Sequence, residues 1–249
     1  MKPLLAVFEG RLGAELDSSA LATELRRRGV HAVALLGTWH DSHGYRDPVP
    51  AAREEAYATS LHREEIEVWV YGWPTWDKDA PQGGLRRWCR DMVEHVVRLD
   101  ASMLMVDLES SSLIGSAVDD NRVETLYGLL EEELAKAGRK GTPIGVTYFH
   151  DSKAPGIRVA LRRSLVQILQ TYKGEPERAR VRLEKAKAAA PKLDLWSAAP
   201  AFGENSEAAL DPYLDAIGMA QPKGVIMWKR VQMSEREWTS AQQVTRGSL

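Results

Sequence analysis

Short apolar runs alternate with longer amphipathic runs along the whole chain. Eight of the short runs are rich in apolar residues, and we expect each of them to form a strand. Most of them are continuously apolar, which is typical of strands that are covered on both faces in a parallel sheet. The expected strands cover residues 4–9, 31–36, 67–73, 102–109, 143–149, 165–172, 193–199 and 224–230.

The segments between these runs carry the signals of helices. Ser18 and Ser19 can cap a helix that ends before Gly29, and Pro50 suits the first turn of the next helix. Pro212 indicates a break or a new start in the helix before the last strand. Two other segments show an apolar stripe at helical spacing, made of Leu85, Trp88, Cys89, Met92 and Val96 and of Val123, Leu126, Tyr127, Leu130 and Leu134.

Further signals complete the alternation. Asp120 or Asn121 caps the second of these stripes, and Gly138 closes it. A highly charged helix precedes the seventh strand. The polar tail at about 231–249 contains a last helix, which we expect to pack on the strands.

Eight alternations of strand and helix in 249 residues predict a single (β/α)8 TIM barrel that spans residues 1–249. The alternative is an open doubly wound sheet, for which we would expect a glycine-rich phosphate-binding loop after the first strand. Residues 9–16, EGRLGAEL, match neither the GxGxxG nor the Walker A pattern. No internal repeat and no linker-like composition divides the chain into domains.

Composition and charge narrow the range of functions. A net charge of −2 gives no reason to expect a nucleic-acid partner. The single cysteine, Cys89, lies within an apolar stripe, so we expect a core thiol and not a catalytic one. No run is long enough to span a membrane, and the first ten residues lack the features of a signal peptide. We therefore expect a protein that is cytoplasmic as synthesised and that leaves the cell, if it does, through lysis or a secretion device.

The candidate chemistry follows from the barrel, because barrel sites lie at the carboxyl ends of the strands. Asp107 and Glu109 end the fourth expected strand in the sequence VDLE, and residues two apart on a strand share a face, so we expect both to point into the barrel mouth. Two neighbouring carboxylates raise the pKa of one of them, which suits a general acid beside an ionised partner. The competing interpretation is a buried polar network in which both acids pair with basic residues such as Lys229.

Glu9 is a third acid, at the end of the first expected strand. It is costly to bury unless it is paired or useful, although a strand-end residue in solvent would need no explanation. Three carboxylates can hold a divalent metal, but the nearby sequence WHDSHG has irregular spacing. We therefore expect neither a metal nor a cofactor.

Aromatic residues gather at the same ends of the expected strands. Eight Trp against three Phe is an unusual balance, and indole faces stack well on sugar rings while the indole N–H can donate a hydrogen bond. For each single Trp, packing at the barrel rim is the competing interpretation. The candidate substrate contacts are Trp39, Tyr71, Trp73, Tyr148, Gln170, Trp196, Trp228 and Lys229, and the implied partner is a polysaccharide.

At VDLE the chain resembles barrel glycoside hydrolases of the bacterial and phage N-acetylmuramidase type, glycoside hydrolase family 25, and more distantly the chitinases. Glu9, MVDLES and PIGVTYF fall in the order in which that family places its strand-one acid, its strand-four Asp-x-Glu and its aromatic fifth strand. The resemblance implies Glu109 as general acid. It implies Asp107 as the residue that orients or stabilises a charged intermediate, formed with help from the substrate's N-acetyl group.

The resemblance covers roughly the first 150 residues, and the sequence departs from the family in places. FEGRLG replaces the Asp-x-Ser setting of the muramidase first strand, and SMLMVDLE lacks the upstream acids and glycines of the chitinase signature.

Three functions stay open. The first is a glycoside hydrolase acting on a polysaccharide such as peptidoglycan. The second is a non-catalytic barrel that binds glycan or protein as a module of a phage tail or secretion device. The third is a metal-dependent or sugar-phosphate barrel enzyme, with its ligand near Glu9, Asp107 and Lys229.

Overall fold

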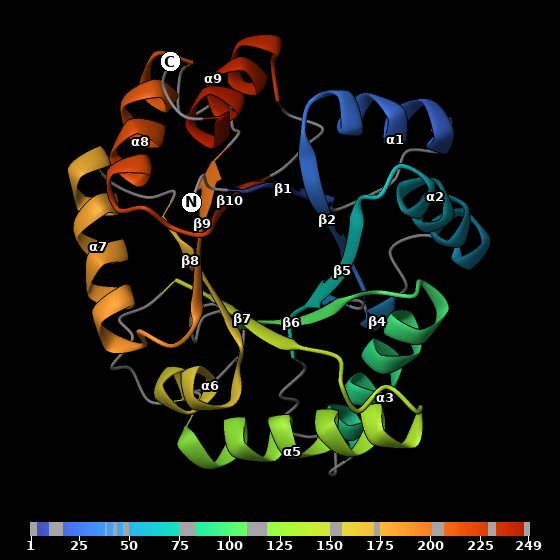
Figure 1. Ribbon diagram of the computed structural model, residues 1–249. Coiled ribbons are helices and arrows are strands. Elements are labelled where there is room, and N and C mark those ends of the chain that lie inside the picture. Colours follow the sequence, from blue (N-terminus) through green and yellow to red (C-terminus); the bar gives the residue numbers. More distant parts are fainter. Residues whose placement is uncertain are drawn as a thin grey trace.

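A computed structural model of the protein describes residues 4–9, 17–37, 39–41, 44–46, 50–74, 83–108, 119–149, 156–171, 175–200, 207–228 and 233–246. Eight parallel strands close into a barrel, and helices surround it (Figure 1). The ring of neighbouring strands runs β1-β10-β9-β8-β7-β6-β5-β2. The (β/α)8 TIM barrel expected from the sequence is thereby confirmed.

Each barrel strand matches an expected strand to within two residues at either end. Its strands are β1 Leu4–Glu9, β2 Val30–Leu36, β5 Glu67–Gly72, β6 Met103–Leu108, β7 Ile144–Tyr148, β8 Val166–Gln170, β9 Asp194–Pro200 and β10 Gly224–Trp228. A short antiparallel pair, β3 Trp39–Asp41 and β4 Gly44–Arg46, lies outside the barrel sheet and was not expected. Strands of three residues are too short to show a periodic pattern.

The helices of the described part of the chain are α1 Ser18–Arg27, α2 Ala51–Arg63, α3 Gly83–Arg98, α5 Asp120–Lys136, α6 Ile157–Arg163, α7 Pro176–Ala189, α8 Glu207–Met219 and α9 Glu235–Arg246. The short helix α6 had no counterpart in the sequence interpretation. α9 contacts α8, β1 and β10, which confirms that the last helix packs on the barrel. It begins with a reciprocal cap, in which Ser234 N donates to Glu237 Oε2 at 2.6 Å and Glu237 N donates to Ser234 Oγ at 3.3 Å.

Three helix signals were misplaced. Asp17, and not Ser18 or Ser19, caps α1, with its carboxylate accepting from two backbone N–H groups at 3.0 Å. Asp119 caps α5 one residue before the expected position. α8 runs through Pro212 without a break. Buried residues on both sides of that proline hold the helix against its neighbours, and this packing offsets the missing N–H donor.

The strands separate two layers of core packing. Residues of one alternation phase fill the barrel interior, namely Ala6, Phe8, Ala32, Ala34, Leu36, Trp69, Tyr71, Met103, Met105, Ile168, Trp196, Ala198 and Ile226. Residues of the other phase pack between the strands and the helices. Cys89 and Trp88 belong to this outer layer, and burial strongly raises the pKa of the Cys89 thiol, as expected of a core cysteine.

Candidate active site at the carboxyl end of the barrel

Three polar side chains from adjacent strands meet inside the barrel at its carboxyl end. Asp107 on β6 follows Met103 and Met105 on the inner face, and it lies beside Thr147 of β7 in the strand register. Gln170 of β8 shares the inner phase of Ile168. Its Nε2 donates to Asp107 Oδ1 at 3.0 Å and to Thr147 Oγ1 at 3.2 Å. The expectation that Asp107 points into the barrel is therefore supported by the register.

Aromatic rings form the other part of the same end. Phe8 lies edge-on to Tyr71, with ring centroids 4.8 Å apart, and edge-on to Trp228 at 5.0 Å. Tyr71 also contacts Trp73 at 5.9 Å and Trp228 at 6.0 Å. These residues come from β1, from β5 with the residue that follows it, and from β10, whereas the polar group comes from β6, β7 and β8. The barrel end thus has a polar side and an aromatic side, a combination that is common in ligand-binding sites.

Burial differs across this end. Asp107 and Phe8 are 2% exposed and Tyr71 is fully buried, whereas Trp73 and Trp228 are partly exposed. Solvent therefore reaches the two indole rings more readily than it reaches the Asp107 carboxylate.

Glu9 does not share this inner face. It follows the alternation of Leu5 and Val7, which pack in the outer layer, and its register partner Leu35 belongs to that layer too. The alternation places the buried Glu9 side chain on the side of β1 that faces the helices. The structure thus separates Glu9 from Asp107, with which we had grouped it.

Tyr148 also faces the helices. Its hydroxyl donates to Gln167 Oε1 at 2.9 Å, and both residues are fully buried. Thr147, one residue earlier, occupies the inward position on β7, whereas the sequence suggested Tyr148 as the substrate contact. A period-two pattern divides a strand into two faces. In IGVTY every residue of both faces is buried, so the pattern alone does not tell which face points towards the helices.

Trp196 lies deeper than expected. We placed it at a strand end, but it is the third residue of the seven-residue β9. It is 3% exposed and packs edge-on against Trp69 inside the barrel, with centroids 5.0 Å apart. A Cβ atom at its register partner Gly224 would lie 2.3 Å from the Trp196 ring, so glycine is needed for this close approach.

Other candidates fall outside what the structure describes. These are Glu109, Lys229 and the side chain of Trp39. Phe8 and Thr147 are residues of this end that sequence reasoning missed. Both residues lie on the inward face of their strands. That face can be identified only when the register with the neighbouring strands is known.

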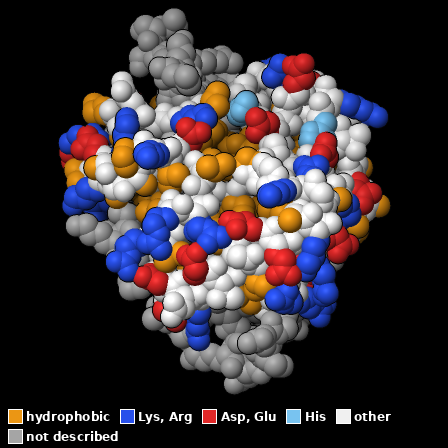
Figure 2. Space-filling view, turned by 60° about the horizontal axis from the view of Figure 1, so that its bottom comes forward, with side chains coloured by type: hydrophobic (Ala, Val, Ile, Leu, Met, Phe, Trp, Pro, Cys, Tyr) orange, Lys and Arg blue, Asp and Glu red, His pale blue; other side chains and the backbone are white. Residues whose placement is uncertain are grey.

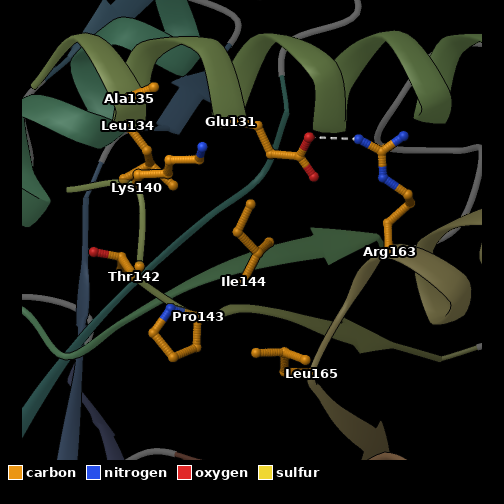
Figure 3. A pocket seen from close by; sticks show the side chains of 10 residues that line it. Glu131, Leu134, Ala135, Lys140, Thr142, Pro143, Ile144, Arg163 and Leu165 are labelled. Carbon is orange, nitrogen blue, oxygen red and sulfur yellow. Dashed lines mark hydrogen bonds and ion pairs between the residues drawn. The ribbon is translucent and has the colours of Figure 1, made fainter. Parts of the chain in front are cut away.

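A separate pocket of about 300 Å³ lies near the amino ends of β7 and β8 (Figure 3). Its lining includes Thr142, Ile144 and Leu165, and the ion pair between Arg163 and Glu131, at 2.7 Å, crosses one side of it. Because Asp107 lies at the carboxyl ends of the strands, this pocket is at the opposite end of the barrel. In this fold that end contributes to stability more than to chemistry.

The surface carries charges of both signs. On the face shown in Figure 2, basic and acidic side chains are interspersed around exposed apolar ones. Within the described ranges, no group of three or more His, Cys, Asp or Glu side chains is placed to hold a metal ion. None of the described helices combines the length and the apolar character that a membrane span requires.

No protein-family model matches the chain, and comparison with curated proteins gave no match. Among solved structures, an endo-β-N-acetylglucosaminidase from Cordyceps militaris has a TM-score of 0.68 at 11% identity, over 99% of this chain and 90% of that one. That structure is a variant in which an Asp and a Glu two positions later are replaced by their amides, in complex with fucosyl-N-acetylglucosamine-Asn.

Two other solved structures are similar to the same degree. The Bacillus cereus spore cortex-lytic enzyme SleL has a TM-score of 0.68 at 10% identity, over 97% of this chain and 74% of that one. Active domain 2 of a Pyrococcus furiosus chitinase has a TM-score of 0.67 at 10% identity, over 99% and 94%. These structural neighbours are barrel glycoside hydrolases, and at such identities the likeness shows a common fold.

Proposed function

We propose that the protein is a glycoside hydrolase that acts on a polysaccharide, with peptidoglycan as the first substrate to test. The observation that carries the proposal is the inward-facing Asp107 at the carboxyl end of β6, the end of the barrel at which partly exposed Trp73 and Trp228 also lie. Glu109 follows at the i+2 position of the sequence. In the Cordyceps militaris variant an Asp and a Glu at the same i, i+2 spacing are replaced by their amides, which supports the assignment.

The proposed roles follow from chemistry and burial. Glu109 acts as the general acid that protonates the leaving oxygen of the glycosidic bond. Asp107, held by Gln170 and 2% exposed, acts as the charged partner that stabilises positive charge developing on the sugar. The indole faces of Trp73 and Trp228 support the sugar rings, with their partly exposed surfaces available for stacking. The polar substituents of the sugar then face β6 to β8.

The test is release of reducing ends from purified peptidoglycan and from chitin oligosaccharides. We expect Glu109→Gln to lower kcat by roughly 100-fold or more, because an amide cannot donate the proton. Asp107→Asn should also lower kcat, whereas Asp194→Asn should leave it unchanged. Asp194 is a matched control because it lies at the start of β9, at the other end of the barrel. Full activity in Glu109→Gln would refute the proposed mechanism.

The burial of Asp107 favours a second candidate, a barrel that binds glycan without turnover. In that case the wild type retains a saccharide on an affinity column but releases no reducing ends. Asp107→Asn then binds as the wild type does, and Trp228→Ala binds more weakly. These results would replace the hydrolase proposal with a binding role.

A further inference from the structure

The side-chain amide of Gln170 joins three neighbouring strands. Its nitrogen has two hydrogens and two acceptors, Asp107 Oδ1 at 3.0 Å and Thr147 Oγ1 at 3.2 Å. All three side chains are at least nine-tenths buried, with exposures of 4% for Gln170, 2% for Asp107 and zero for Thr147. Both hydrogens of the amide group are therefore committed inside the barrel.

This arrangement fixes which way the amide points. The nitrogen of Gln170, and not its oxygen, faces Asp107, and this orientation suits an ionised carboxylate, which only accepts hydrogen bonds. The Thr147 hydroxyl takes the second hydrogen and prevents the amide from rotating away. A donor that is already oriented lowers the free energy of the carboxylate without reorganisation, which is how a buried charge is best supported.

We propose that Gln170 is a positioning residue, which holds the Asp107 carboxylate ionised and in one orientation for the reaction. This inference rests on the proposed function, and it replaces the direct substrate contact expected from the sequence. A carboxylate that stabilises positive charge must keep both its charge and its position while the sugar changes shape. Gln170 contributes to both through its hydrogen bond to Asp107 Oδ1, and Thr147 maintains the direction of that bond.

The neighbouring Gln167 shows what a structural glutamine looks like in the same strand. It lies on the opposite face of β8, accepts from Tyr148, and donates to the carbonyl oxygen of Ala190 at 3.2 Å. These contacts join the strand to the helix layer and involve no ionisable acid other than the Tyr148 phenol. Gln167 is therefore the matched control, because it has the same residue type, the same strand and the same burial.

The first test is the ionisation of Asp107, followed by carbon NMR of labelled aspartate carboxyl groups, with Asp107→Asn identifying the signal. We expect Gln170→Met, which keeps the volume and removes the donor, to shift the titration midpoint of Asp107 upward relative to the wild type. Gln170→Ala should shift it in the same direction. Gln167→Met should leave it unchanged. An unchanged midpoint in Gln170→Met, or an equal shift in Gln167→Met, would overturn the inference.

The second test is kinetic. Losing a hydrogen bond to a charged group costs about 1.5–3 kcal/mol, so Gln170→Met should lower kcat roughly 10- to 100-fold with little change in KM. If Gln170→Met retained the wild-type activity while Gln170→Ala lost it, only the side-chain volume at this position would matter, and the positioning role would be refuted. If the wild type has no turnover, the proposed function fails, whereas the NMR titration still decides whether Gln170 holds Asp107.

Discussion

The phenol of Tyr148 donates a hydrogen bond to the side-chain oxygen of Gln167, at 2.9 Å, in the layer between β7, β8 and the helices. The side-chain nitrogen of Gln167 in turn donates hydrogen bonds to the carbonyl oxygens of Ala186 and Ala190, at the end of α7. The tyrosine that the sequence placed in a sugar site is thus part of the packing between strands and helices.

Tyr148→Phe should therefore affect stability and leave catalysis intact. The change removes a donor and leaves a fully buried amide oxygen without it, which costs about 1–3 kcal/mol. Urea unfolding measures this loss, and reducing-end release measures activity on the same preparations. A large fall in activity with unchanged stability would mean that Tyr148 contacts substrate after all.

The strands could be predicted from the sequence because each is a compact apolar run between polar segments. Inner and outer faces could not be assigned in the same way. In β7 and β9 both faces are buried, so a choice of phase for Tyr148 or of depth for Trp196 needs the register between strands. Asp107 was placed correctly because it is the one acid in an otherwise apolar strand. Gln170 was recognised as polar, but its partner lies 63 residues away in the sequence.

Trp196 and Trp228 should respond differently to truncation. Trp196→Ala removes a ring packed inside the barrel against Trp69, so we expect a loss of about 3–5 kcal/mol in the free energy of unfolding. Trp228→Ala removes a partly exposed ring, so we expect a smaller loss of stability and a rise in KM of roughly 10-fold. Thermal unfolding and saccharide kinetics on both variants test the contrast. Equal effects on KM would place both rings in the sugar site.

Arg28 fastens the last helix to the first. Its guanidinium pairs with Glu24 and Glu235, both at 2.5 Å, and lies 4.8 Å from the centre of the Trp238 ring. The side chain is 11% exposed, so the loss of these contacts in Arg28→Ala should cost about 1–3 kcal/mol. Arg28→Lys keeps the charge but loses the planar guanidinium group, so its free energy of unfolding should lie between those of the wild type and Arg28→Ala. Chemical unfolding of the three proteins measures the series, and an unchanged Arg28→Ala would contradict it.

Acid should weaken the amino end of the barrel through Glu67. The hydrogen bond with His31 does most to lower the pKa of Glu67, which is about 2. Hydrogen bonds from the Trp69 indole and the Ser102 hydroxyl lower this pKa further. Because the folded pKa lies below the ordinary value near 4.5, the ionised form stabilises the fold above that pH. This contribution should fade as the pH falls from about 4.5 towards 2.

The contribution of Glu67 is modest, because the carboxylate is 44% exposed and water screens it. Glu67→Gln keeps an oxygen that can accept from Trp69 but cannot titrate. We therefore expect the difference in unfolding free energy between wild type and Glu67→Gln to shrink as the pH is lowered through this range. Urea unfolding at a series of pH values measures that difference. A difference that stays constant down to the lowest pH would show that the ionisation of Glu67 does not support the fold.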